Sequence, residues 1–216
     1  MKTRYISWDE ALGYKKDELE YAAGVLREGG LVAFPTETVY GLGGNGLMKE
    51  ASVKIYEAKG RPSDNPLILH ISSRQELEPI VRGITPEAEA LMEAFWPGPM
   101  TLIFQKAPEV PLETTGGLET VAVRMPSHAG ARELIRQAGV PVAAPSANTS
   151  GRPSPTRAEH VKEDLDGKID VIIDGGQVGI GIESTIIDLT EDVPVILRPG
   201  YITKAMAEQV VGEVRM

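Results

Sequence analysis

Eight short apolar runs constrain more than any other feature how this 216-residue chain can fold. Each run has only three to five residues, which is the length of a buried strand and too short for a helix. Helical periodicity lies between many of the runs, whereas the last ones follow one another closely. We therefore predict an α/β fold with a mixed sheet. The predicted strands cover residues 31–34, 67–71, 101–105, 121–124, 141–144, 171–173, 185–189 and 195–198.

Composition indicates one compact globular domain. Apolar residues make up 42% of the chain and charged residues 25%, and no apolar run is long enough to span a bilayer. Residues 1–16 contain no apolar signal-peptide core, and the absence of cysteine excludes disulfides and thiolate metal sites. We therefore expect a cytoplasmic protein with no membrane association. The net charge of −9 disfavours a protein that binds mainly by wrapping a nucleic-acid backbone.

Residues 31–61 combine a strand end, glycines and two cations. Pro35 ends the first apolar run because it has no N–H for the next ladder bond, so the polar cluster Thr36–Tyr40 lies just beyond a strand. The glycine-rich run Gly41–Gly46 follows, and its main expected role is to let the chain turn. A helix then delivers Lys59 and Arg61 on either side of a glycine. These features predict a site for an anion such as a phosphate.

The run Gly41–Gly46 also matches the dinucleotide-binding pattern G-x-G-x-x-G. In that fingerprint the glycines lie in the tight turn between strand and helix. Here the residues PTETVY separate the strand from the first glycine, and no second mononucleotide-binding half is evident. A nicotinamide-dinucleotide-binding oxidoreductase is therefore the less favoured alternative.

A second polar loop follows the strand predicted at residues 141–144. Its residues Ser146 and Asn148 come after a strand end, and Arg198 ends another apolar strand just before a Pro-Gly pair. A cation at the point where a buried strand emerges costs desolvation free energy unless it meets an anion. Taken alone, Lys59 and Arg61 could simply be solvated cations favoured at a helix C-terminus. The second loop and Arg198 favour the ligand-binding interpretation instead.

Helix starts and histidines give further expectations. Capping boxes are predicted at Asp17–Glu20, Ser73–Glu76 and Thr156–Glu159. His70 lies inside an apolar strand, where a hydrogen-bonded core histidine is the ordinary explanation. The three histidines have no metal-ligand spacing, and we predict no metal bound by protein side chains.

Five segments resemble the threonylcarbamoyl-adenylate synthases, the YrdC-like or TsaC family. In chain order they are PTETVYGLG, KGRPSDNPLILHI, PSANTSGRPSPT, ESTIIDL and ILRPG, between about Gly29 and Thr203. The resemblance implies a twisted, mixed parallel and antiparallel sheet with flanking helices and a large, concave, positively charged site. It implies a catalytic domain at residues 1–202. Residues 203–216 are expected to form a C-terminal helix that begins a linker, without the second domain of the longer family members.

The resemblance implies that L-threonine, bicarbonate or carbon dioxide, and ATP react to give threonylcarbamoyl-AMP and pyrophosphate. Magnesium is expected on the β- and γ-phosphates. A downstream transferase machinery then modifies an adenosine of tRNA, so that this chain has weak or no direct tRNA binding. Lys59 and Arg61 are expected to be catalytic. The residues implied for ATP are Lys59, Ser146, Asn148, Ser154, Ser184 and Arg198, and those for threonine are Thr36, Tyr40, Arg61, His70 and Thr120.

Two competing functions are compatible with the same fold. An RNA-binding module without catalysis would use the concave surface for RNA alone, and it predicts salt-sensitive RNA affinity without ATP turnover. A related carbamoyl-transferring module occurs in larger hydrogenase-maturation proteins together with zinc-finger domains. The absence of cysteine disfavours the carbamoyl-transferring module.

Overall fold

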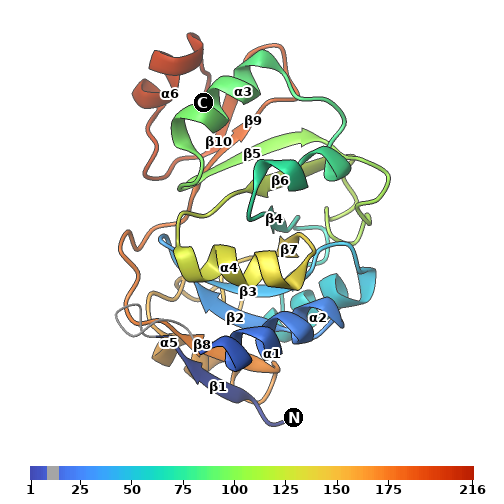
Figure 1. Cartoon of the computed structure of the whole chain (residues 1–216). Helices are drawn as coiled ribbons and strands as arrows, with labels where there is room; N and C mark the ends of the chain where they lie inside the picture. Colours follow the sequence, from blue (N-terminus) through green and yellow to red (C-terminus); the bar gives the residue numbers. More distant parts are fainter. Residues whose placement is uncertain (9–14) are drawn as a thin grey trace.

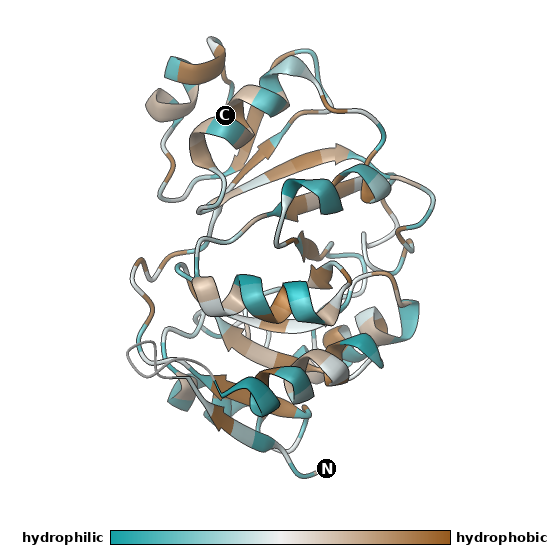
Figure 2. Cartoon of the chain, in the orientation of Figure 1, coloured by the Kyte–Doolittle hydropathy of each residue, from teal (hydrophilic) through white to brown (hydrophobic). Residues whose placement is uncertain are grey.

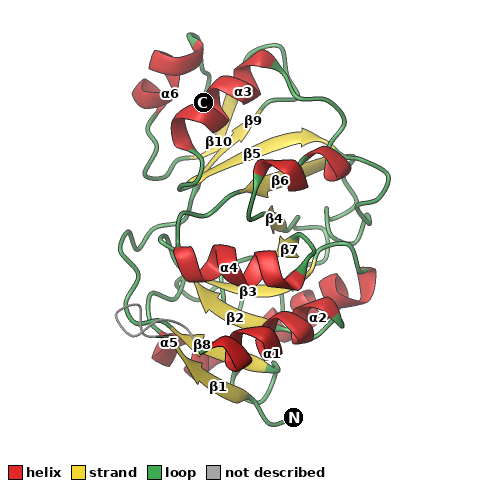
Figure 3. Ribbon diagram, in the orientation of Figure 1, coloured by secondary structure: helices red, strands yellow, loops and turns green. Residues whose placement is uncertain are grey.

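The computed structural model describes residues 1–8 and 15–216. The described residues form one ten-stranded sheet with helices packed on it (Figures 1 and 3). The strands are β1 (Arg4–Ser7), β2 (Val32–Pro35), β3 (Tyr40–Asn45), β4 (Ile68–His70), β5 (Met100–Gln105), β6 (Thr120–Arg124), β7 (Val142–Ala143), β8 (Val171–Asp174), β9 (Thr185–Asp188) and β10 (Val195–Arg198). The helices are α1 (Lys16–Arg27), α2 (Lys49–Lys59), α3 (Pro86–Phe95), α4 (Ala129–Ala138), α5 (Ala158–Leu165) and α6 (Lys204–Val211), with 3₁₀ turns η1 (Arg74–Glu76) and η2 (Glu78–Ile80).

The sheet is mixed, as predicted. Its strand order is β1-β8-β2-β3-β7-β4-β6-β5-β9-β10. The pairs β1/β8, β8/β2, β4/β6 and β5/β9 are parallel, and the remaining neighbours are antiparallel. All eight predicted strands are present, and two further strands, β1 and β3, were not predicted. In this order β8 lies next to β2, and β9 lies next to β5, so strands that are far apart in the sequence are neighbours in the sheet.

The β1-to-β3 end of the sheet is covered on both faces because its side chains alternate between two cores. Val32 and Phe34 face the cluster built with α1 and α4, whereas Ala33 between them faces the cluster that includes α2 and α5. Ile172 of β8 follows the same alternation. The strands accordingly consist mainly of hydrophobic residues, and the outer surfaces of the helices carry many hydrophilic ones (Figure 2).

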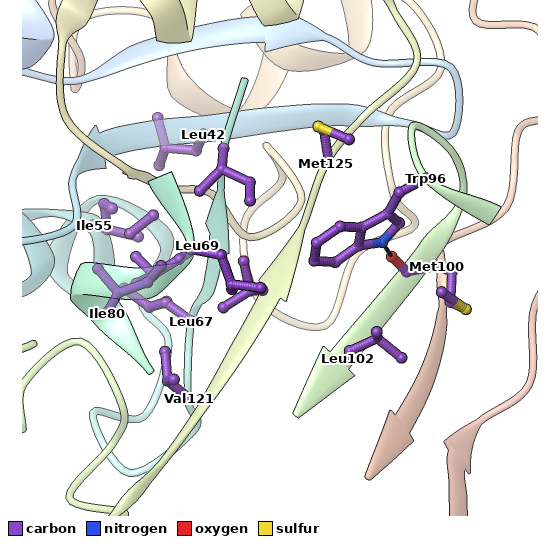
Figure 4. Packing of buried hydrophobic residues seen from close by; sticks show 14 of the residues in the cluster. Leu42, Ile55, Leu67, Leu69, Ile80, Trp96, Met100, Leu102, Val121 and Met125 are labelled. Carbon is purple, nitrogen blue, oxygen red and sulfur yellow. Dashed lines mark hydrogen bonds between the residues drawn. The ribbon is translucent and has the colours of Figure 1, made fainter. Parts of the chain in front are cut away.

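At the other end of the sheet, the described helices lie on one face. Helices α3 and α6 pack against each other over β5, β9 and β10 (Figure 1). Figure 4 shows buried residues of the larger core, which runs from Leu42 of β3 to Leu102 of β5, and in it the Trp96 indole N–H donates to the Met100 carbonyl at 2.7 Å. Residues 203–216, expected to begin a linker, lie in this layer, and Arg215 forms a bridge with Val195 of β10. Among the described residues, no helix has the length and apolarity needed to cross a membrane.

The glycine-rich run is a strand and not a turn, so that prediction was wrong. Strand β3 pairs antiparallel with β2 on one side and with β7 on the other. A Cβ at Gly43 would lie 2.7 Å from a ring carbon of Phe34 and 2.9 Å from a methyl of Val142. A Cβ at Gly46 would meet the Leu69 side chain at 2.2 Å. The glycines are therefore needed because large side chains from neighbouring strands fill the space that a Cβ would take.

Of the three predicted capping boxes, only Ser73–Glu76 is present, and it opens the 3₁₀ turn η1. Helix α1 begins one residue before Asp17, which therefore lies inside the first turn and cannot act as its N-cap. Helix α5 begins at Ala158 with Arg157 as its N-cap, so the start predicted from Thr156 was too early.

Candidate active site

A pocket of about 410 Å³ lies on the face of the sheet that α3 and α6 leave uncovered. Its floor is apolar because strand side chains alternate. Leu69, Val123, Leu102 and Ile187 point into the core under the helices. Their chain neighbours on β4, β6, β5 and β9 line the pocket instead, and these are Ile68, Ala122, Ile103 and Ile186.

Polar side chains surround this floor, and most of them come from strand ends and the loops that follow. Three arginines line the pocket, from the loop after α2 and from the ends of β6 and β10. The polar and charged lining residues are Thr36, Thr38, Arg61, Asn65, His70, Arg124, Ser146, Glu183, Ser184 and Arg198. Their number and charge make the pocket suited to an anionic ligand with several hydrogen-bonding groups.

Lys59 and Arg61 are placed differently by the end of α2. The helix stops at Gly60, which has the left-handed conformation with φ 62°, and the chain then turns away. Lys59 is 1% exposed, and its ammonium donates to the Ser146 carbonyl. Burial, with a smaller contribution from Arg61, lowers the pKa of Lys59 to about 8. Arg61 lines the pocket itself and donates to the carbonyls of Asn65 at 3.2 Å and Pro66 at 2.9 Å.

Arg124 forms a buried network with the loop after β2. Its guanidinium forms an ion pair with Glu37 and donates to the Thr38 hydroxyl at 2.9 Å. The Thr36 and Thr38 hydroxyls are 2.9 Å apart. Glu37 also accepts backbone N–H bonds from Ser127 at 2.6 Å and from the next residue at 3.0 Å, just before α4. Burial lowers the pKa of Arg124 to about 9. This network fixes Thr36 and Arg124 relative to each other on one side of the pocket.

Arg198, at the end of β10, is held in the same way by residues just before β9. Its Nε donates to the Ser184 carbonyl at 3.0 Å, and Nη2 donates to the Ser184 hydroxyl at 3.2 Å. Nη1 forms an ion pair with Glu183, whose second carboxylate oxygen accepts from the Ser154 hydroxyl at 2.7 Å. Burial is the main cause that lowers the pKa of Arg198.

His70 is a neutral group at the pocket wall. Burial lowers its pKa to about 4, although the carbonyls of Ile68 and Val142 partly oppose the effect. Its Nδ1 lies 3.1 Å from the Ile68 carbonyl, so a hydrogen bond there requires the proton on Nδ1. The ring therefore offers hydrogen bonding without a positive charge at neutral pH.

The structure brings together most of the predicted site residues. Six of them line the pocket directly, namely Thr36, Arg61, His70, Ser146, Ser184 and Arg198. Three others lie just behind the lining residues. Lys59 contacts Ser146, Ser154 contacts Glu183, and Asn148 lies in the loop that follows Ser146. Asn148 donates to the carbonyls of Thr149 and Arg152, both at 2.9 Å, and so shapes the loop.

Tyr40 and Thr120 are not among the residues that line the pocket. Tyr40 is fully buried, and its hydroxyl donates to the Gly176 carbonyl at 2.7 Å and accepts from the Gly175 N–H at 3.1 Å. Thr120 lies at the start of β6, opposite Gln105 of β5, whereas the charged pocket residue of β6 is at the other end. Both residues were expected to contact threonine, and the structure places neither at the pocket.

Five polar pocket or network residues were missed by sequence reasoning, namely Glu37, Thr38, Asn65, Arg124 and Glu183. A signal existed for Arg124, because it ends the apolar run of β6 in the same way that Arg198 ends β10. The desolvation argument applied to Arg198 therefore applies equally to Arg124. No comparable signal distinguishes Glu183 from the other acidic residues of the chain.

Comparisons with known proteins agree with this arrangement. The Sua5/YciO/YrdC family model, described as "Telomere recombination", matches residues 24–200. A Pyrococcus abyssi protein named threonylcarbamoyl-AMP synthase is 58% identical over 92% of this chain and 58% of its own length. A Bacillus subtilis protein of the same name is 52% identical over the whole chain and 63% of its own length. The chain thus spans about three fifths of the length of these relatives.

A solved structure shows the same fold. The crystal structure of P. abyssi Sua5 complexed with L-threonine has a TM-score of 0.94 and 54% identity, and the match covers 100% of this chain and 62% of that one. The mixed sheet with flanking helices is therefore confirmed. Because the family model covers most of the chain and relatives exceed 50% identity, the chain belongs to the Sua5/YciO/YrdC family.

Proposed function

We propose that this chain makes threonylcarbamoyl-AMP and pyrophosphate from L-threonine, bicarbonate or carbon dioxide, and ATP. The observation that carries the proposal is a pocket of about 410 Å³ with an apolar floor and three arginines around it. The names of the P. abyssi and B. subtilis relatives support it, as does the threonine-bound P. abyssi structure. In this proposal the pocket is positively charged overall, because three arginines line it against one carboxylate, Glu183, and the Lys59 ammonium lies behind Ser146.

The chemistry needs alignment and charge neutralisation more than a strong base. Threonine and bicarbonate give a carbamate with release of water and a proton. A carbamate oxygen then forms a bond to the α-phosphorus of ATP while the bond to pyrophosphate breaks. Both reacting groups are anions, so cations that hold them in line lower the barrier. Lys59 and Arg61 are the proposed catalytic residues, because Arg61 lines the pocket and the Lys59 ammonium lies next to it, against the carbonyl of the lining residue Ser146.

Threonine is proposed to bind on the side of Thr36, His70 and Arg124. The buried Arg124 can pair with the threonine carboxylate, and the hydroxyl of Thr36 and the neutral ring of His70 can bond its polar groups. A site that hydrogen-bonds a substrate hydroxyl rejects analogues that lack it strongly. Tyr40 is proposed to act behind the pocket, where it holds Gly175 and Gly176.

ATP is proposed to bind on the side of Ser146, Ser184 and Arg198, with Asn148 and Ser154 shaping the loop around it. Among the described residues, no group of three or more His, Asp or Glu side chains could hold a metal ion. Glu183 is the carboxylate at the pocket, and it is already engaged by Arg198. Magnesium, which neutralises charge on the phosphates, therefore fits this site as an ion carried by ATP on its β- and γ-phosphates.

The fate of the product, the location and the domain bounds are proposed on the same basis. The product is proposed to pass to a tRNA-threonylcarbamoyl transferase machinery, so this chain needs little or no direct tRNA contact. A cytoplasmic location fits a cysteine-free chain. Residues 1–202 are proposed as the catalytic domain and residues 203–216 as a C-terminal helix, packed against α3, after which a linker would begin.

Pyrophosphate release tests the function. We expect release from ATP only when threonine and bicarbonate are both present, and strong loss in Arg61→Ala. Arg74→Ala is a matched control, because Arg74 is an exposed arginine that pairs with Glu89 outside the pocket. Pyrophosphate release that is unchanged when threonine and bicarbonate are both omitted would refute the proposal. Salt-sensitive RNA affinity without any ATP turnover would favour an RNA-binding module instead.

A further inference from the structure

Glu183 connects two groups proposed to bind ATP. It lies just before β9 and is the carboxylate among the residues that line the pocket. One of its oxygens accepts from the Ser154 hydroxyl at 2.7 Å, and the other forms the ion pair with Arg198. These partners come from separate segments, the loop after β7 and the end of β10. Glu183 therefore joins two separate segments of the chain at the pocket.

The contacts of Arg198 define which of its donors remain available. A guanidinium has five N–H donors in a fixed plane. One Nη1–H is directed to Glu183, the Nε–H to the Ser184 carbonyl, and one Nη2–H to the Ser184 hydroxyl. One N–H on each terminal nitrogen is left. Two such donors on one guanidinium can bind two oxygens of a phosphate.

Glu183 could act in two opposite ways. Its negative charge raises the pKa of both Lys59 and Arg61, so the charge is felt across the pocket. If charge were its only effect, it would weaken the attraction of the pocket for a polyphosphate. If it fixes the orientation of Arg198 and Ser154, it would strengthen binding, because the ligand then need not order those side chains.

We propose that Glu183 is a positioning residue for ATP, which it serves by holding Arg198 and Ser154 in the orientation that binds phosphates. This inference rests on the proposed function and adds to it the group that organises the nucleotide side of the pocket. The Glu183 and Arg198 side chains are 34% and 33% exposed, so neutralising Glu183 leaves no deeply buried unpaired charge. Variants at this position should therefore fold.

Two variants with the same change in charge separate positioning from electrostatics. Glu183→Gln keeps an oxygen that can accept from Arg198 and an amide N–H₂ that can donate to the Ser154 hydroxyl. Glu183→Ala keeps neither contact. We expect ATP affinity, measured by titration calorimetry, to stay within about threefold of wild type in Glu183→Gln and to fall roughly tenfold in Glu183→Ala. The KM for threonine should stay unchanged in both variants.

Controls make each outcome decisive. Glu133→Ala removes an exposed carboxylate that pairs with Arg136 on α4, and it should not change ATP affinity. Equal ATP affinities in the Gln and Ala variants of Glu183, at or above the wild-type affinity, would overturn the positioning role. Wild-type protein that neither binds ATP nor releases pyrophosphate would instead overturn the proposed function, and this inference with it. Melting temperatures confirm that all variants are folded.

Discussion

The low pKa of Lys59 predicts that ATP binding weakens above pH 8. Lys59 is 1% exposed, and burial lowers the pKa of its ammonium from 10.5 to about 8. The protonated fraction of the free protein then falls from about nine tenths at pH 7 to about one tenth at pH 9. If the cation pairs with a phosphate, ATP affinity should fall roughly tenfold over the same interval.

Direct binding is the suitable assay, because turnover would also respond to the titration of threonine and bicarbonate. We would measure the Kd for ATP by calorimetry at constant ionic strength from about pH 7.5 to about pH 9.5, a range in which the phosphates are already ionised. Lys59→Arg keeps its charge throughout and should give a flat profile. Lys59→Met, of similar length and without charge, should bind weakly at every pH.

Folding stability changes in the opposite direction, which separates weaker binding from unfolding. Between about pH 8 and pH 10 the unfolded chain keeps a proton on Lys59 that the folded chain has lost. The unfolded state binds more protons, so the free energy of unfolding rises with pH in this window. A wild-type Kd that stays constant to about pH 9.5, or a decline of equal size in Lys59→Arg, would refute the reasoning.

Three further predictions concern other parts of the chain. Arg61→Ala should lower adenylate formation, measured as pyrophosphate release, by about 10² or more without a change in melting temperature, and near-wild-type turnover would remove its catalytic role. Glu37→Gln should lower the free energy of unfolding, measured with urea, by about 3 kcal/mol, because it leaves the buried Arg124 charge without its partner; an unchanged urea midpoint would contradict this. Gly43→Ala should lower the free energy of unfolding by about 1–3 kcal/mol, because its Cβ meets Phe34 and Val142. Gly24→Ala in α1, whose Cβ would have nothing within 4 Å, should leave stability unchanged or raise it. Equal effects of the two substitutions would show that contact with Phe34 and Val142 is not the reason for glycine at position 43.

The regular, buried part of the fold follows from sequence because apolar runs report burial directly. The two strands that sequence reasoning missed lack that signal. In β1 only Ile6 is buried, because the strand is at the edge of the sheet. In β3 the sequence YGLGGN contains few side chains, and the reason for its Gly43 lies in Phe34 and Val142 on other strands. The need for glycine can therefore be recognised only from the structure, which shows the side chains of the neighbouring strands.

The site was predictable where a residue follows its own strand, and not where its role depends on a distant partner. Thr36 follows an apolar run and Arg198 ends one, and both line the pocket, whereas His70 lines it from inside an apolar run. Tyr40 lies in an equally suggestive segment, but strand pairing turns its side chain to the core. Glu183 gains its role only from Ser154 and Arg198, to which the sequence gives no connection.

The strand order also has a kinetic consequence. The pocket draws on residues from Thr36 to Arg198, and β10, which carries Arg198, lies at the end of the sheet next to β9. The segment that carries Thr36 also depends on late residues, because β2 pairs with β8 and the Thr38 carbonyl accepts from the Gly181 N–H at 2.9 Å. Because contacts this distant in sequence form slowly, we expect the pocket to be completed late in folding. A ligand that contacts both sides of the pocket would bind only the completed sheet, and it would therefore stabilise the folded state.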